Sequence, residues 1–143
     1  METLKSAGRE PIEVGAGLVF FEGRLLLAQR PQGTHLAGCW EFPGGKRESN
    51  ETMGECVTRE LREELGILVR PVRLYHQLIH HYPQKSVSLW FYVCELLDGT
   101  PKPLGCSAVA WADRRSLGKF QFPAADEQLL NLLQTDLALW KAD

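Results

Sequence analysis

Three glutamates between residues 60 and 64 are the side chains of this chain best suited to chemistry. Glu60, Glu63 and Glu64 are spaced i, i+3 and i+4, and side chains at that spacing share one face of an α-helix. Like charges so close together repel and destabilise an isolated helix. A divalent cation would remove this repulsion, so we interpret the three carboxylates as a metal site. Hard carboxylate oxygens suit Mg²⁺ or Mn²⁺, and not a soft metal.

A magnesium site of this kind points to phosphate chemistry. Mg²⁺ takes few carboxylates, keeps several waters and completes its coordination with substrate phosphate oxygens. It also lowers the pKa of a bound water, so the expected reaction is attack of water on a phosphoanhydride. Gly44 and Gly45 precede the glutamates and allow close approach of the backbone to phosphate. We expect Arg59 to pair with Glu51 or with one of the metal-binding glutamates.

The competing interpretation is a solvated charged helix face, which the Arg-Glu-x-x-Glu-Glu pattern alone would favour. Five further constraints argue against it. The pattern also has glycine at 45, Glu51, Arg59, Gly66 and an aliphatic residue at 67, within the stretch GKRESNETMGECVTRELREELGI. Chance agreement with all of these positions is very improbable.

At every specified position this stretch resembles the Nudix box, which is G, five residues, E, seven residues, R-E-aliphatic, one residue, E-E, one residue, G-aliphatic. Residues 12 to about 140 resemble the MutT branch of the Nudix hydrolases. The supporting stretches are LLLAQRPQGTHLAGCWEFPGGK, SLWFYVCELLDGTP and FPAADEQLL. The resemblance implies an α+β Nudix fold, an α/β/α sandwich with a mixed sheet between helices. It also implies Mg²⁺-dependent hydrolysis of a nucleoside triphosphate to monophosphate and pyrophosphate, usually of an oxidised nucleotide such as 8-oxo-dGTP.

The resemblance assigns a role to each matched residue of the catalytic end. It makes Glu60, Glu63 and Glu64 metal ligands, with Gly44 as a candidate ligand through its backbone carbonyl. Glu51 and Arg59 resemble the supporting pair.

On the substrate side, Arg30 resembles the family arginine that reaches the substrate phosphate, and His35 lies in the same loop. An exposed loop histidine is the alternative for His35. By the same resemblance Phe42 lines the nucleobase. The alternative for Phe42 is a core aromatic residue beneath the catalytic loop.

Asp126 occupies the position at which guanine-specific MutT enzymes carry an asparagine. Asparagine offers both a donor and an acceptor, whereas an ionised aspartate only accepts. Asp126 could therefore accept hydrogen bonds from a ring N–H and an exocyclic amine, as 8-oxoguanine and other bases present. MutT-like relatives that act on cytosine nucleotides also carry aspartate here. The alternative for Asp126 is a cap of the last helix.

The chain departs from the family at Gly105, where MutT-type enzymes often carry a loop glutamate that binds metal or assists the attacking water. No carboxylate lies between Asp98 and Asp113. The base is therefore a box glutamate, or the metal alone activates water, or turnover is weak. We expect an unreactive thiol at the neighbouring Cys106, since the sequence shows no activating base.

These residues must be positioned by a small set of elements. Strands are predicted at residues 12–21, 24–29, 67–80, 87–97 and 108–112, with a short one at 40–42. A helix should follow Ser49 or Asn50 as its cap and end before Gly66. A final helix should open at Pro123. Its predicted buried stripe is Leu129, Leu130, Leu132, Leu133, Leu137 and Trp140.

Composition sets the remaining expectations. With 143 residues the chain suits one domain, predicted at 12–143 after a leader at 1–11 that has no signal-peptide character. The net charge of -2 argues against a nucleic acid polymer or an anionic membrane as a partner. No apolar run approaches the roughly 18 residues of a membrane span. The four cysteines lack metal spacing, which suggests thiols in a cytoplasmic protein, and no obligate protein partner is evident.

Three other functions remain open from the sequence. One is a Nudix hydrolase of another substrate, such as a cytosine nucleotide, a dinucleotide polyphosphate or a nucleotide sugar. The second is a nucleotide-binding module without hydrolysis, supported only by Gly105. The third is a domain that recognises oxidised bases, of the kind appended to adenine glycosylases, which usually lacks an intact box.

Overall fold

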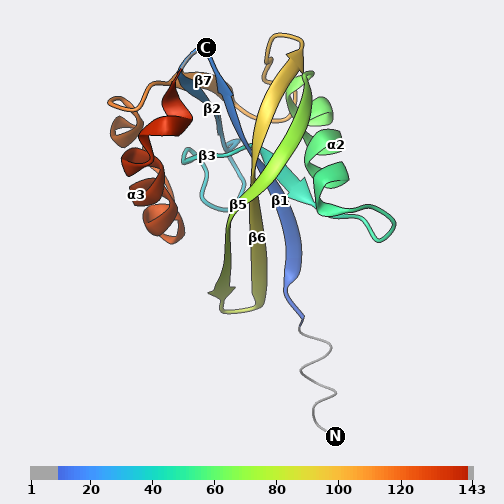
Figure 1. Ribbon diagram of the computed structural model, residues 1–143. Coiled ribbons are helices and arrows are strands. Elements are labelled where there is room, and N and C mark those ends of the chain that lie inside the picture. Colours follow the sequence, from blue (N-terminus) through green and yellow to red (C-terminus); the bar gives the residue numbers. More distant parts are fainter. Residues whose placement is uncertain (1–9, 142–143) are drawn as a thin grey trace, which may run out of the picture.

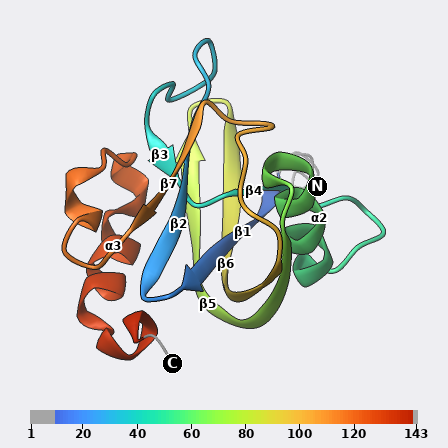
Figure 2. The ribbon, with the colours of Figure 1, turned by 90° about the horizontal axis from the view of Figure 1, so that it is seen from above.

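Seven strands form one mixed sheet between two helices in the computed structural model, which describes residues 10–141. Figure 1 and Figure 2 show α2 on one side of the sheet and α3 on the other. The elements are β1 (Ile12–Phe21), β2 (Arg24–Gln29), β3 (Trp40–Glu41), β4 (Gly44–Lys46), α2 (Met53–Leu65), β5 (Leu68–Tyr82), β6 (Lys85–Asp98), β7 (Ala108–Ala112) and α3 (Glu127–Thr135). Single 3₁₀ turns lie at Leu117–Lys119, Ala124–Asp126 and Leu137–Trp140. The predicted mixed-sheet sandwich is confirmed.

The strand order is β3-β2-β1-β6-β5, with β4 also paired to β1 and β7 to β2. Only β1 and β6 run parallel, and every other pair is antiparallel. One edge of β1 pairs with β6 over most of its length. The other edge is divided, because β4 pairs with residues 14–16 and β2 with residues 20–21. Between these two pairings the Gly17 N–H donates to the Pro43 carbonyl at 2.8 Å.

Alternation along β1 and β2 sends side chains to two separate cores. Leu18 packs with Leu25 and Leu27 on the α3 side, whereas Val19 packs with Leu26 on the α2 side. This is the period of two expected for strands covered on both faces. Gly17 faces α2, and a Cβ there would lie 2.9 Å from a methyl of Leu61, so the glycine permits close helix packing.

Helix α2 begins with a capping box, which corrects the predicted cap at Ser49 or Asn50. The Thr52 hydroxyl accepts from the Glu55 N–H at 3.1 Å, and the Glu55 carboxylate accepts from the Thr52 N–H at 2.8 Å. Two backbone donors of the first turn are thereby satisfied. Gly66 ends the helix in the left-handed conformation with φ of 71°, as predicted. The apolar stripe of α2 is buried, as predicted.

The last helix is shorter than predicted. Pro123 leads into a 3₁₀ turn, and α3 begins only at Glu127 and ends at Thr135. The predicted stripe is wrong for Leu132 and Leu137, whose exposed fractions are 41% and 57%. Leu132 lies on the outer face of α3, and Leu137 lies beyond the helix, because the chain breaks at Asp136 and the helical periodicity does not continue. Leu129 and Leu133 form its buried face.

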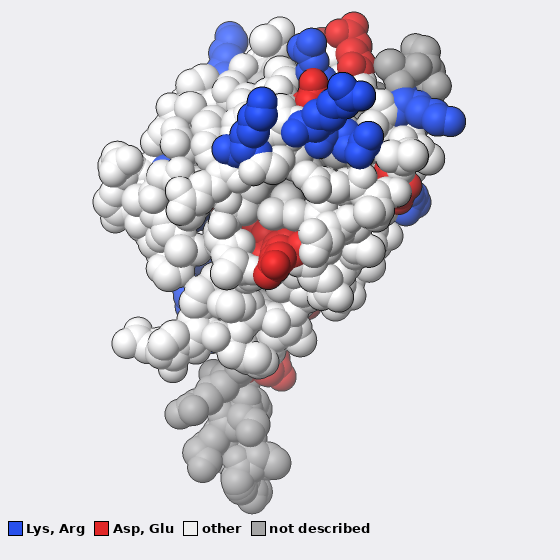
Figure 3. Space-filling view, turned by 90° about the vertical axis from the view of Figure 1, so that its left-hand side faces the viewer, with Lys and Arg blue, Asp and Glu red and all other residues white. Residues whose placement is uncertain are grey.

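Strands β5 and β6 form a hairpin that is longer than predicted and extends beyond the rest of the sheet in Figure 1. In Figure 3, which views the α3 side, basic side chains gather at the upper end and an acidic group lies in a hollow below them. Within residues 10–141, no helix is long and apolar enough to cross a membrane. Most of the predicted leader, residues 1–9, lies outside the described residues.

Candidate active site

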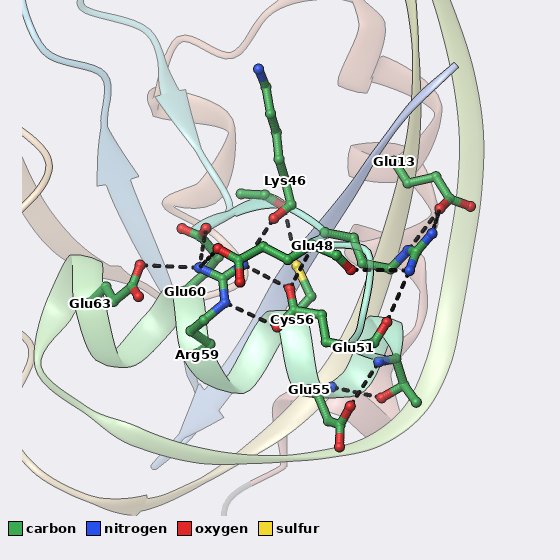
Figure 4. A network of polar contacts seen from close by, with 12 residues as sticks. Glu13, Lys46, Glu48, Glu51, Glu55, Cys56, Arg59, Glu60 and Glu63 are labelled. Atoms are coloured by element: carbon green, nitrogen blue, oxygen red, sulfur yellow. Dashed lines mark hydrogen bonds and ion pairs between the residues drawn. The ribbon is translucent and has the colours of Figure 1, made fainter. Parts of the chain in front are cut away.

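Arg59 joins helix α2 to the loop before it through several carboxylates (Figure 4). Its Nε and Nη2 donate to the two oxygens of Glu51 at 3.0 and 2.8 Å. Its Nη1 donates to Glu60 at 3.0 Å and to Glu63 at 3.2 Å. The predicted pairing of Arg59 with Glu51 is present, and hydrogen bonds from Arg59 hold the Glu51 pKa down to about 2. Arg59 Nη2 also donates to the carbonyl oxygen of Lys46, whose side chain points away from the network.

The three box glutamates occupy different environments. The Glu60 side chain is 19% exposed and lies against Gly45, where an added Cβ would come within 2.6 Å of all three carboxyl-group atoms. The Glu63 side chain is 61% exposed and lies on the outer side of the network. Burial raises the Glu60 pKa, and the bonds from Arg59 act in the opposite direction.

Glu64 is the most strongly perturbed of the three. Its Oε1 is buried and has no hydrogen-bond partner within the described residues. Burial is the main reason that its pKa rises to about 8, and the charges of Glu41 and Glu60 add to the rise. The Gly44 backbone and the Arg30 charge oppose it. A buried carboxylate without a partner is costly unless it is protonated or bound to a cation.

The donor set fits a hard divalent cation. Glu64 offers an unpaired oxygen, Glu60 lies one helical turn away, and the Gly44 backbone is close to Glu64. As the side chains stand, no group of three or more His, Cys, Asp or Glu residues in the described part of the chain could hold an ion. Glu60 and Glu63 instead accept hydrogen bonds from Arg59. The four-residue ligand set therefore stays a prediction.

A pocket of about 290 Å³ adjoins these carboxylates. Its apolar floor comes from β1 and β6, and its polar walls come from several other elements. The polar and charged residues that line it are Arg30, His35, Glu41, Lys46, Glu64, Tyr82, Lys85 and Asp126. Gly44, Gly45 and Phe42 also line it. The pocket thus brings Glu64 together with all four predicted substrate residues, whereas Glu51, Arg59, Glu60 and Glu63 lie outside its lining.

The pocket lining also includes an aromatic and an acidic side chain, Phe42 and Asp126. Phe42 is 5% exposed and stacks on Phe122 with ring centroids 5.1 Å apart, so it is a core residue that also lines the pocket. Asp126 is 8% exposed, and burial followed by the charge of Glu41 raises its pKa to about 6. Asp126 is the N-cap residue of α3, as the alternative expected, but its side chain makes no capping hydrogen bond.

Arg30 and His35 belong to the loop that borders the pocket. Arg30 Nη1 donates to Glu41 Oε1 at 3.0 Å, and its Nε donates to the His35 carbonyl. The His35 ring meets the Tyr82 ring edge-on at 5.0 Å. His35 is an exposed loop residue that also lines the pocket, and its role toward substrate stays a prediction. Tyr82 in turn contacts the ring of His80 at 4.3 Å.

The loop after β6 closes against the end of α2 without supplying a carboxylate. The Gly105 N–H donates to the Glu64 carbonyl at 3.0 Å, and a Cβ at Gly105 would lie 3.2 Å from Glu64 Cγ. Position 105 is therefore directly beside Glu64. Burial, followed by the Glu64 charge, raises the pKa of Cys106, as expected for an unreactive thiol.

Sequence reasoning missed Glu41, Lys46, Tyr82 and Lys85 as pocket residues. Glu41 and Lys46 flank the glycine pair, and this proximity was a usable signal. The tip of the β5–β6 hairpin offered no such signal. Tyr82 and Lys85 line the pocket because these two strands stay paired as far as this tip, which the local sequence does not reveal.

Comparison with known proteins identifies the family. The NUDIX domain matches residues 15–132 of this chain. The chain is a Nudix hydrolase. An 8-oxo-dGTP diphosphatase of Haemophilus influenzae is 36% identical over 123 residues, which cover 85% of this chain and 90% of that protein. A CTP pyrophosphohydrolase of Escherichia coli is 54% identical over 56 residues, 39% of this chain and 42% of that protein.

The fold of this Nudix hydrolase has close counterparts among solved structures. The solution structure of the ORF135 protein of Escherichia coli has a TM-score of 0.78 and 31% identity, and the match covers 96% of this chain and 98% of that one. Together these likenesses place the Nudix hydrolase in the MutT-like branch, whose members hydrolyse nucleotides. Nudix hydrolases generally use divalent metals.

Proposed function

We propose that this Nudix hydrolase cleaves a modified nucleoside triphosphate, such as 8-oxo-dGTP, to the monophosphate and pyrophosphate with Mg²⁺, or Mn²⁺ in its place. One observation carries the proposal: a single pocket is lined by Glu64, whose buried Oε1 has no hydrogen-bond partner within the described residues, and by Phe42 and Asp126. Glu64 suits a metal-bound phosphate chain, and the aromatic and acidic pair suits a nucleobase.

The residues divide the work as follows. Glu60, Glu63 and Glu64, with the Gly44 carbonyl, would hold the metal, which supplies charge neutralisation for the phosphates. Arg59 and Glu51 hold the loop and the helix together and orient Glu60.

The remaining residues bind the substrate. Arg30 and His35 border the phosphates or sugar from the loop above the pocket. Phe42 packs against the base, and Asp126 accepts hydrogen bonds from the edge of the base. Phe42 and Asp126 are both buried. A nucleobase that left Asp126 without a hydrogen-bond partner would therefore be bound weakly, and this favours the correct base.

Cytosine nucleotides are the second candidate substrates, because Asp126 stands where guanine-specific relatives carry asparagine. The E. coli relative named CTP pyrophosphohydrolase supports this candidate. We also propose that residues 12–143 are one catalytic domain. The four free cysteines fit a cytoplasmic location.

A product assay tests the proposal. Purified enzyme with Mg²⁺ is offered 8-oxo-dGTP, dGTP, CTP, dCTP, 5-methyl-dCTP, a dinucleotide polyphosphate and a nucleotide sugar, and products are separated by chromatography. Monophosphate and pyrophosphate from at least one triphosphate are expected. Calorimetric binding without product from any compound would contradict hydrolysis. With Asp126→Asn, kcat/KM should shift toward guanine nucleotides relative to cytosine nucleotides, and an unchanged ratio would remove Asp126 from base recognition.

A further inference from the structure

The described active site contains more carboxylates than metal binding and base recognition account for. Glu64 and Asp126 have proposed roles, but Glu41 lines the same pocket and has none. Glu41 comes from β3, where it pairs with Ala28 of the neighbouring strand, so its backbone is fixed by the sheet. A carboxylate held by a strand is well placed for precise chemistry.

Glu41 stands among the charged groups of the site. Its Oε1 accepts a hydrogen bond from Arg30 at 3.0 Å. Its charge helps to raise the pKa values of Glu64, Asp126 and Cys106. These four groups come from the loop after β2, from α2, from the turn before α3 and from the loop before β7. Glu41 is therefore close enough to both Glu64 and Asp126 for its charge to act on each of them.

Only one oxygen of Glu41 is engaged. Arg30 donates to Oε1, and within the described residues no hydrogen bond involves Oε2. Oε2 is not fully buried, and Glu41 lines the pocket, so water in the pocket can reach this carboxylate. Arg30 thus orients the carboxylate and leaves one oxygen available to a water or substrate.

The other carboxylates are less suitable as acceptors of a proton from the attacking water. Both oxygens of Glu51 accept from Arg59, and Glu60 is also bonded to Arg59. Glu63 is exposed and does not line the pocket. Gly105 lies directly beside Glu64 but has no side chain.

We propose that Glu41 is the general base of this enzyme, a role that rests on the proposed triphosphate hydrolysis. Its free oxygen accepts a proton from water as the water oxygen bonds to phosphorus. The bridging P–O bond breaks, and its electron pair remains on the departing phosphate oxygen. The proton then passes from Glu41 to solvent, so no oxidant or further reactant is needed.

The test compares Glu41→Gln with the wild type. Glutamine can still accept the bond from Arg30 but cannot take a proton at neutral pH. We expect kcat to fall by about 10²-fold or more, which is the usual size of a general-base contribution. KM and Mn²⁺ binding, measured by electron paramagnetic resonance, should stay within about threefold of the wild type by the same reasoning. The control is Glu95→Gln, which removes an exposed carboxylate paired with Arg70 on β5.

Two rescue experiments separate a base from a structural residue. Adding Gly105→Glu to Glu41→Gln introduces a carboxylate beside Glu64 from the loop after β6, and kcat should recover at least about tenfold if proton acceptance is what was lost. If the double variant does not fold, formate added to Glu41→Ala should restore turnover in a concentration-dependent manner.

Several results would overturn the assignment. Unchanged kcat in Glu41→Gln shows that Glu41 is not the base. If Glu41→Gln instead raises KM, and by different factors for guanine and cytosine nucleotides, Glu41 is a base-recognition residue. Loss of Mn²⁺ binding makes it a metal ligand. Absence of turnover by the wild-type enzyme on every substrate refutes the proposed function itself, and is seen before any variant is compared.

Discussion

The Arg59 guanidinium and the Glu51 carboxylate form a two-point ion pair, with N–O distances of 3.0 and 2.8 Å, between the middle of α2 and the loop that precedes it. Parallel bonds of this kind fix the relative orientation of both groups. Because the same guanidinium also donates to Glu60, the position of this proposed metal ligand depends on a loop residue nine positions earlier.

Arg59→Lys should therefore reduce turnover by at least about tenfold, because an ammonium cannot form the two-point pair. Mn²⁺ affinity should fall with it, since Glu60 loses its orientation. Arg62→Lys, on the same helix and exposed, is the control and should retain wild-type kinetics. Steady-state kinetics and Mn²⁺ titration measure both effects, and wild-type Mn²⁺ affinity in Arg59→Lys would contradict the positioning role.

Gly45→Ala should abolish most turnover, because the new methyl would occupy the space of the Glu60 carboxyl group. Gly54→Ala is a matched control within α2, where the nearest atom to an added Cβ is Thr52 Oγ1 at 4.0 Å. This second variant should keep its activity and gain about 0.5–1 kcal/mol of stability. Assays and urea unfolding distinguish the two. Full activity of Gly45→Ala would show that Glu60 need not lie against this backbone.

The stability of the metal-free enzyme should fall as pH rises from about 4.5 to about 8. Burial raises the Glu64 pKa from 4.5 to about 8, so over this range the folded protein binds a proton that the unfolded chain releases. One such carboxyl lowers the unfolding free energy by up to about 1.4 kcal/mol per pH unit. Urea unfolding at several pH values measures the slope.

The same measurement on Glu64→Gln isolates this group. Its slope should be shallower, and Mg²⁺ should stabilise the wild type at pH 8 much more than the variant, because the cation binds the ionised form. Equal slopes in the two proteins would show that Glu64 titrates normally. The other carboxyls with raised pKa, Glu41, Glu60 and Asp126, leave some slope in the variant.

Thr52→Ala should destabilise the enzyme by about 1 kcal/mol through loss of the capping box. Thr58→Ala, within the same helix, should be neutral or slightly stabilising, because alanine is the better helix former. Thermal unfolding compares them. A Thr52→Ala protein as stable as the wild type would mean that water replaces the cap without cost.

The family, the reaction and the sandwich could be predicted because they depend on local patterns. Spacing places Glu60 and Glu64 on one helical face, and the left-handed Gly66 ends that helix where expected. The strands predicted at 12–21 and 24–29 are present and are joined at Glu22 and Gly23, two residues that both have positive φ. Such features need no knowledge of distant contacts.

The pocket depends on contacts that local patterns do not encode. Glu41 becomes a pocket residue through pairing of β3 with β2, and Tyr82 through the length of the hairpin. The environment of Glu64 is likewise tertiary, since its raised pKa reflects burial and a neighbour 23 positions earlier. Thr52 was missed as a cap because Ser49, Asn50 and Thr52 all carry side chains that can cap a helix.

The divided edge of β1 has a consequence for how this enzyme can change. One stretch of β1 pairs with the glycine-rich strand β4, and another stretch pairs with β2. Strand β2 in turn pairs with β3 and β7. The glycine pair beside Glu60 and the strand β3 that carries Glu41 are therefore supported by different stretches of one strand. If Phe42 and Asp126 select the base as proposed, substitutions there should alter which nucleotide is accepted while β4 and α2 keep their arrangement. Glu41 would be the exception, because its charge acts on both Glu64 and Asp126.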